Sequence, residues 1–226
     1  GPRRIQRQSL RRMRSRALLA SETDLEALRA NNPHPPVWAT QHSRLIEASS
    51  GIPAASCSKV ERLLGGAATL RSILQAVQCA CQHIPLEYYI FEPDQTGQRL
   101  LAALTERARQ GVKVRLLVDG VGSSALLGWR GRTMLQAYRQ AGGEFAIFHP
   151  ARLDRWRPLV NLRTHRKIVV VDGSIGFTGG INITDEENEE LFPDVAYRDT
   201  HLRMEGAGVR WLQYVFLQDW VYASGK

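Results

Sequence analysis

The pattern of apolar and polar residues changes character near residue 59. Beyond it, short apolar runs alternate with segments whose apolar residues recur every three or four positions, which is typical of strands alternating with helices. Expected strands span 84–91, 112–118, 144–149 and 199–205, after a short apolar stretch at 60–64, and expected helices span 68–81, 98–110, 131–142 and 207–222. This order predicts an α/β fold in which a β-sheet is flanked by helices on both faces.

A hairpin interrupts the alternation within 164–182, which reads THRKIVVVDGSIGFTGGIN. Asp172 and Gly173 form a typical turn pair, and 174–178 returns as the partner strand. Because a two-residue turn joins only antiparallel strands, the sheet is expected to be mixed.

The same stretch gathers groups that suit phosphate chemistry. His165 and Lys167 are two residues apart, so alternation places them on one face of a strand. Gly179 and Gly180 lack a Cβ and let backbone N–H groups approach a bound group closely. An imidazole, an ammonium, these donors and the Asn182 amide are together the parts needed to hold and attack a phosphate.

Residues 1–50 have a different pattern and are expected to form a separate, basic helical segment. Seven arginines stand between residues 3 and 16, with apolar residues among them. A basic amphipathic helix there would bind an anionic membrane surface or nucleic acid, and the alternative is a solvated tail. Further helices are expected at 21–30 and 38–49, separated by a proline-rich break, and 51–226 is expected to form a single domain.

The composition is that of a globular protein with anionic partners. The chain has 226 residues, of which 43% are hydrophobic, and a formal net charge of +8. Nucleic acid, anionic lipid or a phosphorylated ligand would fit this charge, and a basic surface without a partner is the alternative. No apolar run reaches the roughly 18 residues that a bilayer crossing needs. The three cysteines lack the spacing of a disulfide framework or a zinc site, so a reducing compartment is expected, with no metal and no cofactor.

The joint spacing of the hairpin residues carries a family resemblance. H-x-K, four residues, Asp, six residues and G-G-x-N resembles the signature of the phospholipase D superfamily, and the surrounding sequence is most similar to the N-terminal half of a bacterial cardiolipin synthase. The matching stretches are 86–91 (LEYYIF), 111–123 (GVKVRLLVDGVGS), 163–182 and 197–206 (YRDTHLRMEG), and the resemblance covers 45–222. It implies that 51–226 is one phospholipase D-like catalytic half-domain.

The resemblance also implies a role for the motif residues. His165 would attack phosphorus to form a phosphohistidine, or else protonate the leaving alcohol. Lys167 would neutralise the charge that develops on the phosphate. Asn182 and the backbone of Gly179 and Gly180 would donate hydrogen bonds to the phosphate oxygens.

Two carboxylates complete the expected catalytic set. Asp172 belongs to the motif, but it lies five residues from Lys167 and so on the opposite strand face, which indicates that it mainly holds the turn. Asp199 is the candidate that orients the His165 imidazole, and a surface ion pair with Arg198 is the alternative.

Further residues are expected to bind the substrate. In the family, Glu87, Tyr89 and Asp119 occupy strand positions that face the same region. Arg163 and Arg166 flank the nucleophile and would attract an anionic headgroup. The alternatives are a core position for the tyrosine and a solvated position for the arginines.

The chain contains a single H-x-K motif, whereas cardiolipin synthases resemble a tandem of two such halves. A complete site therefore needs a second half in cis, or a homodimer partner that brings a second His165 across a symmetry axis. The leading hypothesis is a phosphatidyltransferase that acts on a phospholipid substrate, has low activity as an isolated monomer, and lies in the bacterial cytoplasm as a peripheral protein of the inner membrane. The alternative is a homodimeric phosphodiesterase or nuclease of the same superfamily. A third hypothesis is a silent membrane- or nucleic-acid-binding domain, which the complete H-x-K motif disfavours.

Overall fold

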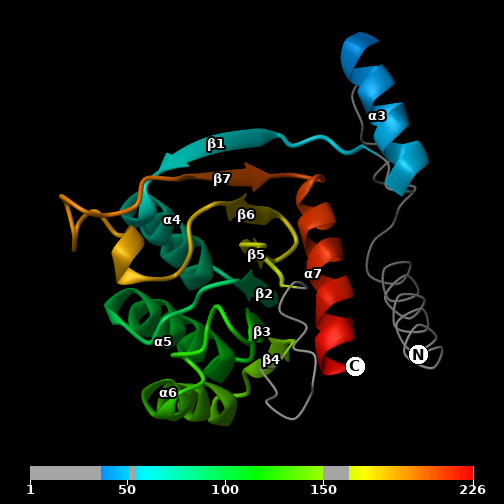
Figure 1. Ribbon diagram of the computed structural model, residues 1–226. Coiled ribbons are helices and arrows are strands. Elements are labelled where there is room, and N and C mark those ends of the chain that lie inside the picture. The colour runs from blue at the N-terminus through cyan, green and yellow to red at the C-terminus, as the bar shows by residue number, and fades with distance from the viewer. Residues whose placement is uncertain (1–36, 51–53, 150–162, 226) are drawn as a thin grey trace, which may run out of the picture.

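The computed structural model describes residues 37–50, 54–149 and 163–225. At its centre these residues form a mixed seven-stranded sheet in the order β1-β7-β6-β5-β2-β3-β4 (Figure 1). Parallel pairing joins β2 (His83–Tyr88), β3 (Lys113–Asp119) and β4 (Glu144–Phe148). Antiparallel pairing begins where β5 meets β2 and joins β5 (Ile168–Val171), β6 (Ile175–Gly179), β7 (Thr200–Glu205) and β1 (Lys59–Leu64).

Helices cover both faces of this sheet. One face carries α4 (Gly66–Gln78), α5 (Gln95–Arg109) and α6 (Trp129–Gln140), and the other carries α7 (Val209–Ser224) (Figure 1). A short 3-10 turn, η1 (Asp185–Glu187), lies between β6 and β7, and α3 (Val37–Ser50) projects away from the sheet (Figure 1). The predicted α/β class, with a mixed sheet between helices, is confirmed.

Strand alternation divides the interior into two hydrophobic cores. On β2 and β3 the even-numbered side chains are fully buried beneath α4–α6: Ile84, Leu86, Val114 and Leu116. Leu117 faces the opposite way and packs with Phe216, Leu217 and Trp220 of α7. Odd-numbered side chains of β2 and β3 therefore face α7.

Several boundaries differ from the sequence expectation. The strand expected at 84–91 ends at Tyr88, and Phe91 forms only an isolated bridge with Ile183. The hairpin strand begins at Ile168, so the motif histidine and lysine precede it. The arginine-rich start, the helix expected at 21–30 and the basic loop at 150–162 lie outside the described residues.

One edge of the sheet gathers the ends of strands from distant parts of the chain. β2, β3 and β6 end there, while β5 and β7 begin there, because β5 runs antiparallel to β2 and β7 antiparallel to β6. We call this the catalytic edge, since the H-x-K segment enters the sheet at it. The opposite edge carries the hairpin turn at 172–173 and the start of β2.

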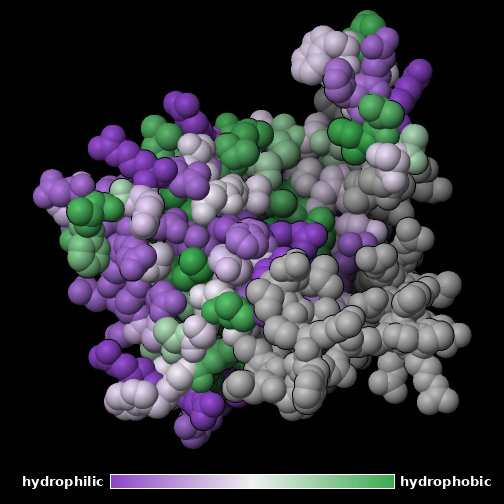
Figure 2. Space-filling view, in the orientation of Figure 1, coloured by the Kyte–Doolittle hydropathy of each residue, from purple (hydrophilic) through white to green (hydrophobic). Residues whose placement is uncertain are grey.

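The visible surface is mainly hydrophilic, with apolar side chains exposed at the left on the loop before β7 (Figure 2). Four large apolar residues of this loop are exposed: Leu191, Phe192, Val195 and Tyr197. Within the described ranges, none of the helices combines the length and the apolar character that spanning a bilayer demands.

Candidate active site

His165 and Lys167 meet on one aromatic ring at the catalytic edge. The imidazole of His165 stacks on the Tyr89 ring, with centroids 3.9 Å apart and an interplanar angle of 20°. Lys167 Nζ lies 5.6 Å from the centroid of the same ring and donates to the His165 carbonyl oxygen at 3.0 Å. The two motif residues thus share one side, as expected, although the common surface is a tyrosine that follows β2.

The His165 ring is open to solvent, whereas Lys167 is buried. His165 is exposed, and no side chain of the described residues hydrogen-bonds its imidazole. Lys167 is only 8% exposed. Burial lowers the pKa of Lys167, while the carboxylates of Glu187 and Asp199 act in the opposite direction and favour its charged form. The arrangement presents an accessible imidazole beside a cation held in place.

The residues around His165 are anchored by acids on other elements. Thr164 Oγ1 donates to Glu87 Oε1 of β2 at 2.5 Å. Arg166 pairs with Asp219 of α7 at 2.5 Å. These contacts hold the backbone in place on both sides of His165.

Arg163 makes a third anchor. Its Nη1 donates to the His149 carbonyl oxygen at 2.9 Å and lies 3.6 Å from Asp119 Oδ1. Asp119 is buried at the end of β3 and also accepts from the N–H groups of Val121 and Gly122. Glu87, Asp119, Arg163 and Arg166, all expected to bind substrate, therefore contact protein partners in this structure.

Glu87 and Asp219 form a buried acid pair. Burial raises the pKa of Glu87 well above its usual value, and the neighbouring Asp219 raises it further. The pKa of Asp219 is raised by burial as well, although Arg166 opposes this. The folded protein therefore holds a proton on Glu87 over a pH range in which an unfolded chain releases it.

Glu87→Gln is expected to make stability less sensitive to pH. The folded state binds the Glu87 proton more tightly than the unfolded state, so wild-type stability falls as pH rises from about 4.5 to the folded pKa. The glutamine amide has no such proton to lose, and the variant should gain stability relative to wild type as pH rises from about 5 to about 8. Urea denaturation at both pH values measures the difference. Glu106→Gln on the exposed side of α5 is the control, and an equal change in both variants would contradict the assignment.

Asn182 is held by a buried glutamate. Its side-chain N–H donates to Glu187 Oε1 at 2.6 Å, its backbone N–H donates to Glu187 Oε2 at 2.8 Å, and its Oδ1 accepts from the Ile90 N–H at 3.3 Å. Glu187 is buried in η1 and lies near enough to Lys167 to influence its pKa. These hydrogen bonds fix the Asn182 amide beside the end of β2, which Tyr89 follows.

The glycine pair accommodates β7 at close range. A Cβ at Gly179 would overlap the Thr200 carbonyl oxygen, and a Cβ at Gly180 would overlap the Asp199 carboxylate. The Gly180 N–H donates to the Thr200 carbonyl oxygen at 3.0 Å, so this N–H is already hydrogen-bonded within the protein. Because these positions are glycine, Asp199 can lie against the end of β6. Any contact between the glycine backbone and a phosphate would be a further role.

Asp199 is close to the site but does not contact the imidazole. Its Oδ1 accepts from the Thr200 N–H, and among the described residues no hydrogen bond or ion pair joins it to His165 or Arg198. Its charge acts on Lys167 and on His201. Its expected role as the residue that orients His165 stays a prediction.

Asp172 lies at the other end of the hairpin. It occupies a left-handed turn with φ of 50°, followed by Gly173 at 65°. Its carboxylate accepts from three backbone N–H groups before and within β2, those of Cys81, Gln82 and His83, at 2.8 to 2.9 Å. Partial burial acts in the opposite direction, but these donors lower its pKa. The contacts agree with a turn-holding role and separate Asp172 from His165 by the length of β5.

Three residues of the site were not anticipated: Glu187, His201 and Asp219. His201 of β7 is fully buried beside Gly179, and neither ring nitrogen has a partner among the described residues. Burial lowers its pKa to about 4, which Asp199 opposes and Lys167 reinforces. Asp219 could have been noticed as the lone acid of an apolar helix, whereas Glu187 is one of several neighbouring acids without a distinguishing pattern.

The sheet topology and the His165–Lys167 pair at its edge define a phospholipase D-like domain. Residues 73–195 match the family described as the PLD-like domain of cardiolipin synthase. The chain belongs to this family, as the sequence resemblance predicted.

The curated relatives are cardiolipin synthases that are longer than this chain. Cardiolipin synthase from Geobacillus sp. (strain WCH70) is 44% identical over 176 residues, which are 77% of this chain and 34% of that protein. Cardiolipin synthase 1 from Bacillus anthracis is 42% identical over 184 residues, or 80% of this chain and 35% of that protein. The phospholipase D family member Nuc from Salmonella typhimurium shares the fold, with a TM-score of 0.52 at 18% identity over 73% of this chain and 97% of Nuc. The chain spans about a third of the length of these curated relatives.

Proposed function

We propose that the chain is one catalytic half of a phosphatidyltransferase that makes cardiolipin or a related phospholipid. The observation that carries the proposal is the placement of an exposed imidazole and a buried ammonium on the Tyr89 ring, in a chain of the cardiolipin synthase family. A phosphodiester can approach the exposed imidazole from solvent, and the ammonium lies on the same tyrosine ring.

The proposed chemistry has two displacement steps. A ring nitrogen of His165 attacks phosphorus, the N–P bond forms, and the P–O bond to the headgroup alcohol breaks while an acid protonates the leaving oxygen. A second alcohol then loses its proton, attacks phosphorus and breaks the N–P bond, which restores the imidazole. Lys167 stabilises the negative charge on the phosphoryl oxygens in both steps, and Asn182 is placed to donate a further hydrogen bond.

A second histidine must supply the acid. The leaving oxygen must take its proton from a group on the far side of phosphorus from His165. The other described histidines near the catalytic edge are His201, which is buried, and His149, whose Nε2 lies 2.7 Å from the Tyr222 hydroxyl oxygen. We infer that a second H-x-K motif, in cis or on a homodimer partner, completes the site. In the same proposal, 1–50 is an accessory basic segment and 51–226 is the half-domain.

The catalytic edge carries exposed apolar side chains that could contact a membrane surface. Five side chains are 43–80% exposed on loops or a helix start that adjoin the end of β3 and the start of β7: Val121, Trp129, Phe192, Val195 and Tyr197. Exposed apolar and aromatic groups that lie together favour contact with a bilayer surface. We propose a peripheral location on the cytoplasmic face of the inner membrane, where the phospholipid substrate lies.

A lipid assay tests the proposal. Vesicles containing phosphatidylglycerol are incubated with this chain and, in parallel, with the full natural gene product. We expect cardiolipin and free glycerol, with far less product from the chain as a monomer. Degradation of plasmid DNA with no change in the lipid would instead favour the phosphodiesterase alternative, which the net charge of +8 also suits.

A further inference from the structure

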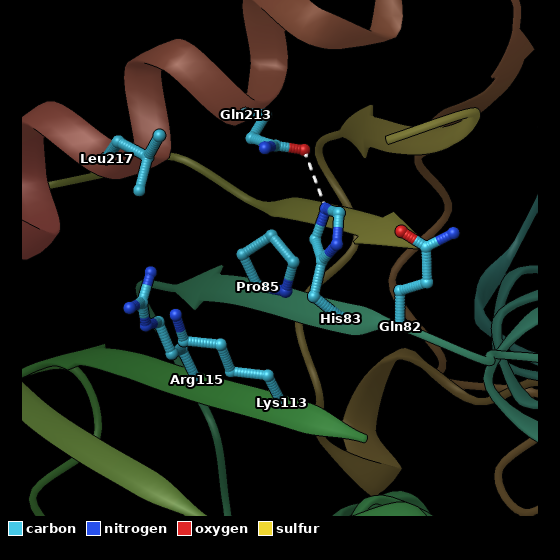
Figure 3. Close-up of a pocket in the computed structure, with 7 residues that line it drawn as sticks. All are labelled: Gln82, His83, Pro85, Lys113, Arg115, Gln213 and Leu217. Atoms are coloured by element: carbon cyan, nitrogen blue, oxygen red, sulfur yellow. Dashed lines mark hydrogen bonds between the residues drawn. The ribbon is translucent and has the colours of Figure 1, made fainter. Parts of the chain in front are cut away.

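A pocket with a partly polar lining lies at the opposite edge of the sheet from His165. It has a volume of about 300 Å³ and is bounded by the starts of β2 and β3 on one side and by α7 on the other (Figure 3). Strand register explains its composition, because His83 pairs with Lys113 and Pro85 pairs with Arg115. All four side chains occupy odd positions and face α7.

The helix closes the pocket with one polar and one apolar residue. Gln213 and Leu217 are four residues apart, so they project from the same side of α7 toward the strands (Figure 3). Gln213 Oε1 lies 3.0 Å from His83 Nε2, and this contact joins the helix to β2. Buried Pro85 and Leu217 give the pocket an apolar floor and wall.

The charges that line the pocket are all positive. Lys113 is exposed and, among the described residues, makes no ion pair. Arg115 is partly engaged, because its Nε lies 3.3 Å from the Glu144 carboxylate and its guanidinium lies 5.6 Å from the centroid of the Trp220 ring. Gln82 and Gln213 add amide groups, and no carboxylate of the described part of the chain lines the pocket.

We propose that this pocket binds the phosphate group of a small organic phosphate. Lys113 supplies the charge, the free N–H groups of Arg115 and the amide of Gln82 supply directional donors, and the apolar wall accommodates the carbon portion of the ligand. The ligand is either a soluble organic phosphate, for which glycerol phosphate serves as the probe, or the headgroup of an anionic phospholipid. The site is independent of the proposed phosphatidyl transfer, since the catalytic edge and the pocket lie at opposite ends of the strands.

The pocket adjoins the turn of the hairpin formed by β5 and β6. The backbone N–H groups of Gln82 and His83, which line it, donate to Asp172, and a Cβ built on Gly173 would come within van der Waals contact of Gln213 and His83. A bound ligand would therefore contact residues that are held by the hairpin turn.

Binding measurements test the proposal. Inorganic phosphate, sn-glycerol 3-phosphate and phosphatidylglycerol vesicles are each titrated into the Lys167→Met variant, in which the active-site ammonium is absent. We expect saturable binding, accompanied by shifts of the His83 ring resonances in NMR spectra. Preference for glycerol phosphate would identify a soluble ligand, and binding to vesicles alone would identify a lipid headgroup.

Lys113→Gln, added to this background, should weaken binding about tenfold, because a charge-assisted contact is lost. Lys59→Gln removes the same charge from β1, far from the pocket, and should leave affinity unchanged. Absence of saturable binding to all three probes, or equal weakening by both substitutions, would overturn the proposal.

Discussion

His165→Ala is expected to lower the rate of phosphatidyl transfer by roughly 10⁴-fold or more, because the proposed nucleophile is removed. The ring is exposed and makes no hydrogen bond to a described side chain, so its loss should leave the fold intact apart from the stacking on Tyr89. The rate of cardiolipin formation is measured in whichever form turns over, this chain or the full gene product.

A matched control separates loss of the nucleophile from loss of a histidine in general. His42 is exposed on α3, outside the sheet, and His42→Ala should retain full activity. A phosphorylated histidine, detected by ³¹P NMR after mixing with substrate, should form in wild type and disappear only in His165→Ala. Activity of His165→Ala within tenfold of wild type would place the nucleophile elsewhere.

Lys167→Met should lower the rate by about 10²–10³-fold, because one preorganised positive charge at the phosphoryl group is lost. Burial already disfavours the charged ammonium in the folded protein, and methionine keeps most of the apolar stem. The variant should therefore be at least as stable as wild type, so a lower rate would report chemistry and not unfolding.

The measurement is the rate at saturating lipid, together with the melting temperature. Lys59→Met on exposed β1 is the control, and it should change neither quantity. A Lys167→Met variant that melts well below wild type, or that retains its rate, would show that the lysine serves structure and not transition-state charge.

The hairpin and the alternating elements could be predicted because local chemistry determines them. A turn pair such as Asp172-Gly173 specifies its own left-handed backbone, and apolar periodicity specifies the helices. The sequence also predicts that His165 and Lys167 lie on the same side. It does not predict that Tyr89 is the surface they share, because that contact requires β5 to lie beside β2. The order of strands in the sheet determines this, and neither segment shows it alone.

The partners of the charged residues were the least predictable part of the site. From the sequence, Glu87 and Arg166 are each expected to bind a ligand. In the fold, Glu87 instead accepts a hydrogen bond from Thr164, and Arg166 pairs with Asp219. Such pairings join residues far apart in the chain, and many acids and bases of the sequence could satisfy them equally well. Composition predicts anionic partners, but the three-dimensional arrangement decides which basic side chains are left unpaired to bind them.

The three bonds that Asp172 accepts also have a consequence for the order of folding. Their donors lie 89 to 91 residues earlier in the chain, so the carboxylate cannot make them until a long loop has closed. The hairpin can begin locally, but its turn becomes fixed only when β2 has docked, which couples the motif to the slowest, least local contacts of the sheet. Once the sheet is complete, opening the hairpin also breaks these bonds. Strand β5, which directly follows the H-x-K segment, should therefore unfold with the whole domain and not by itself.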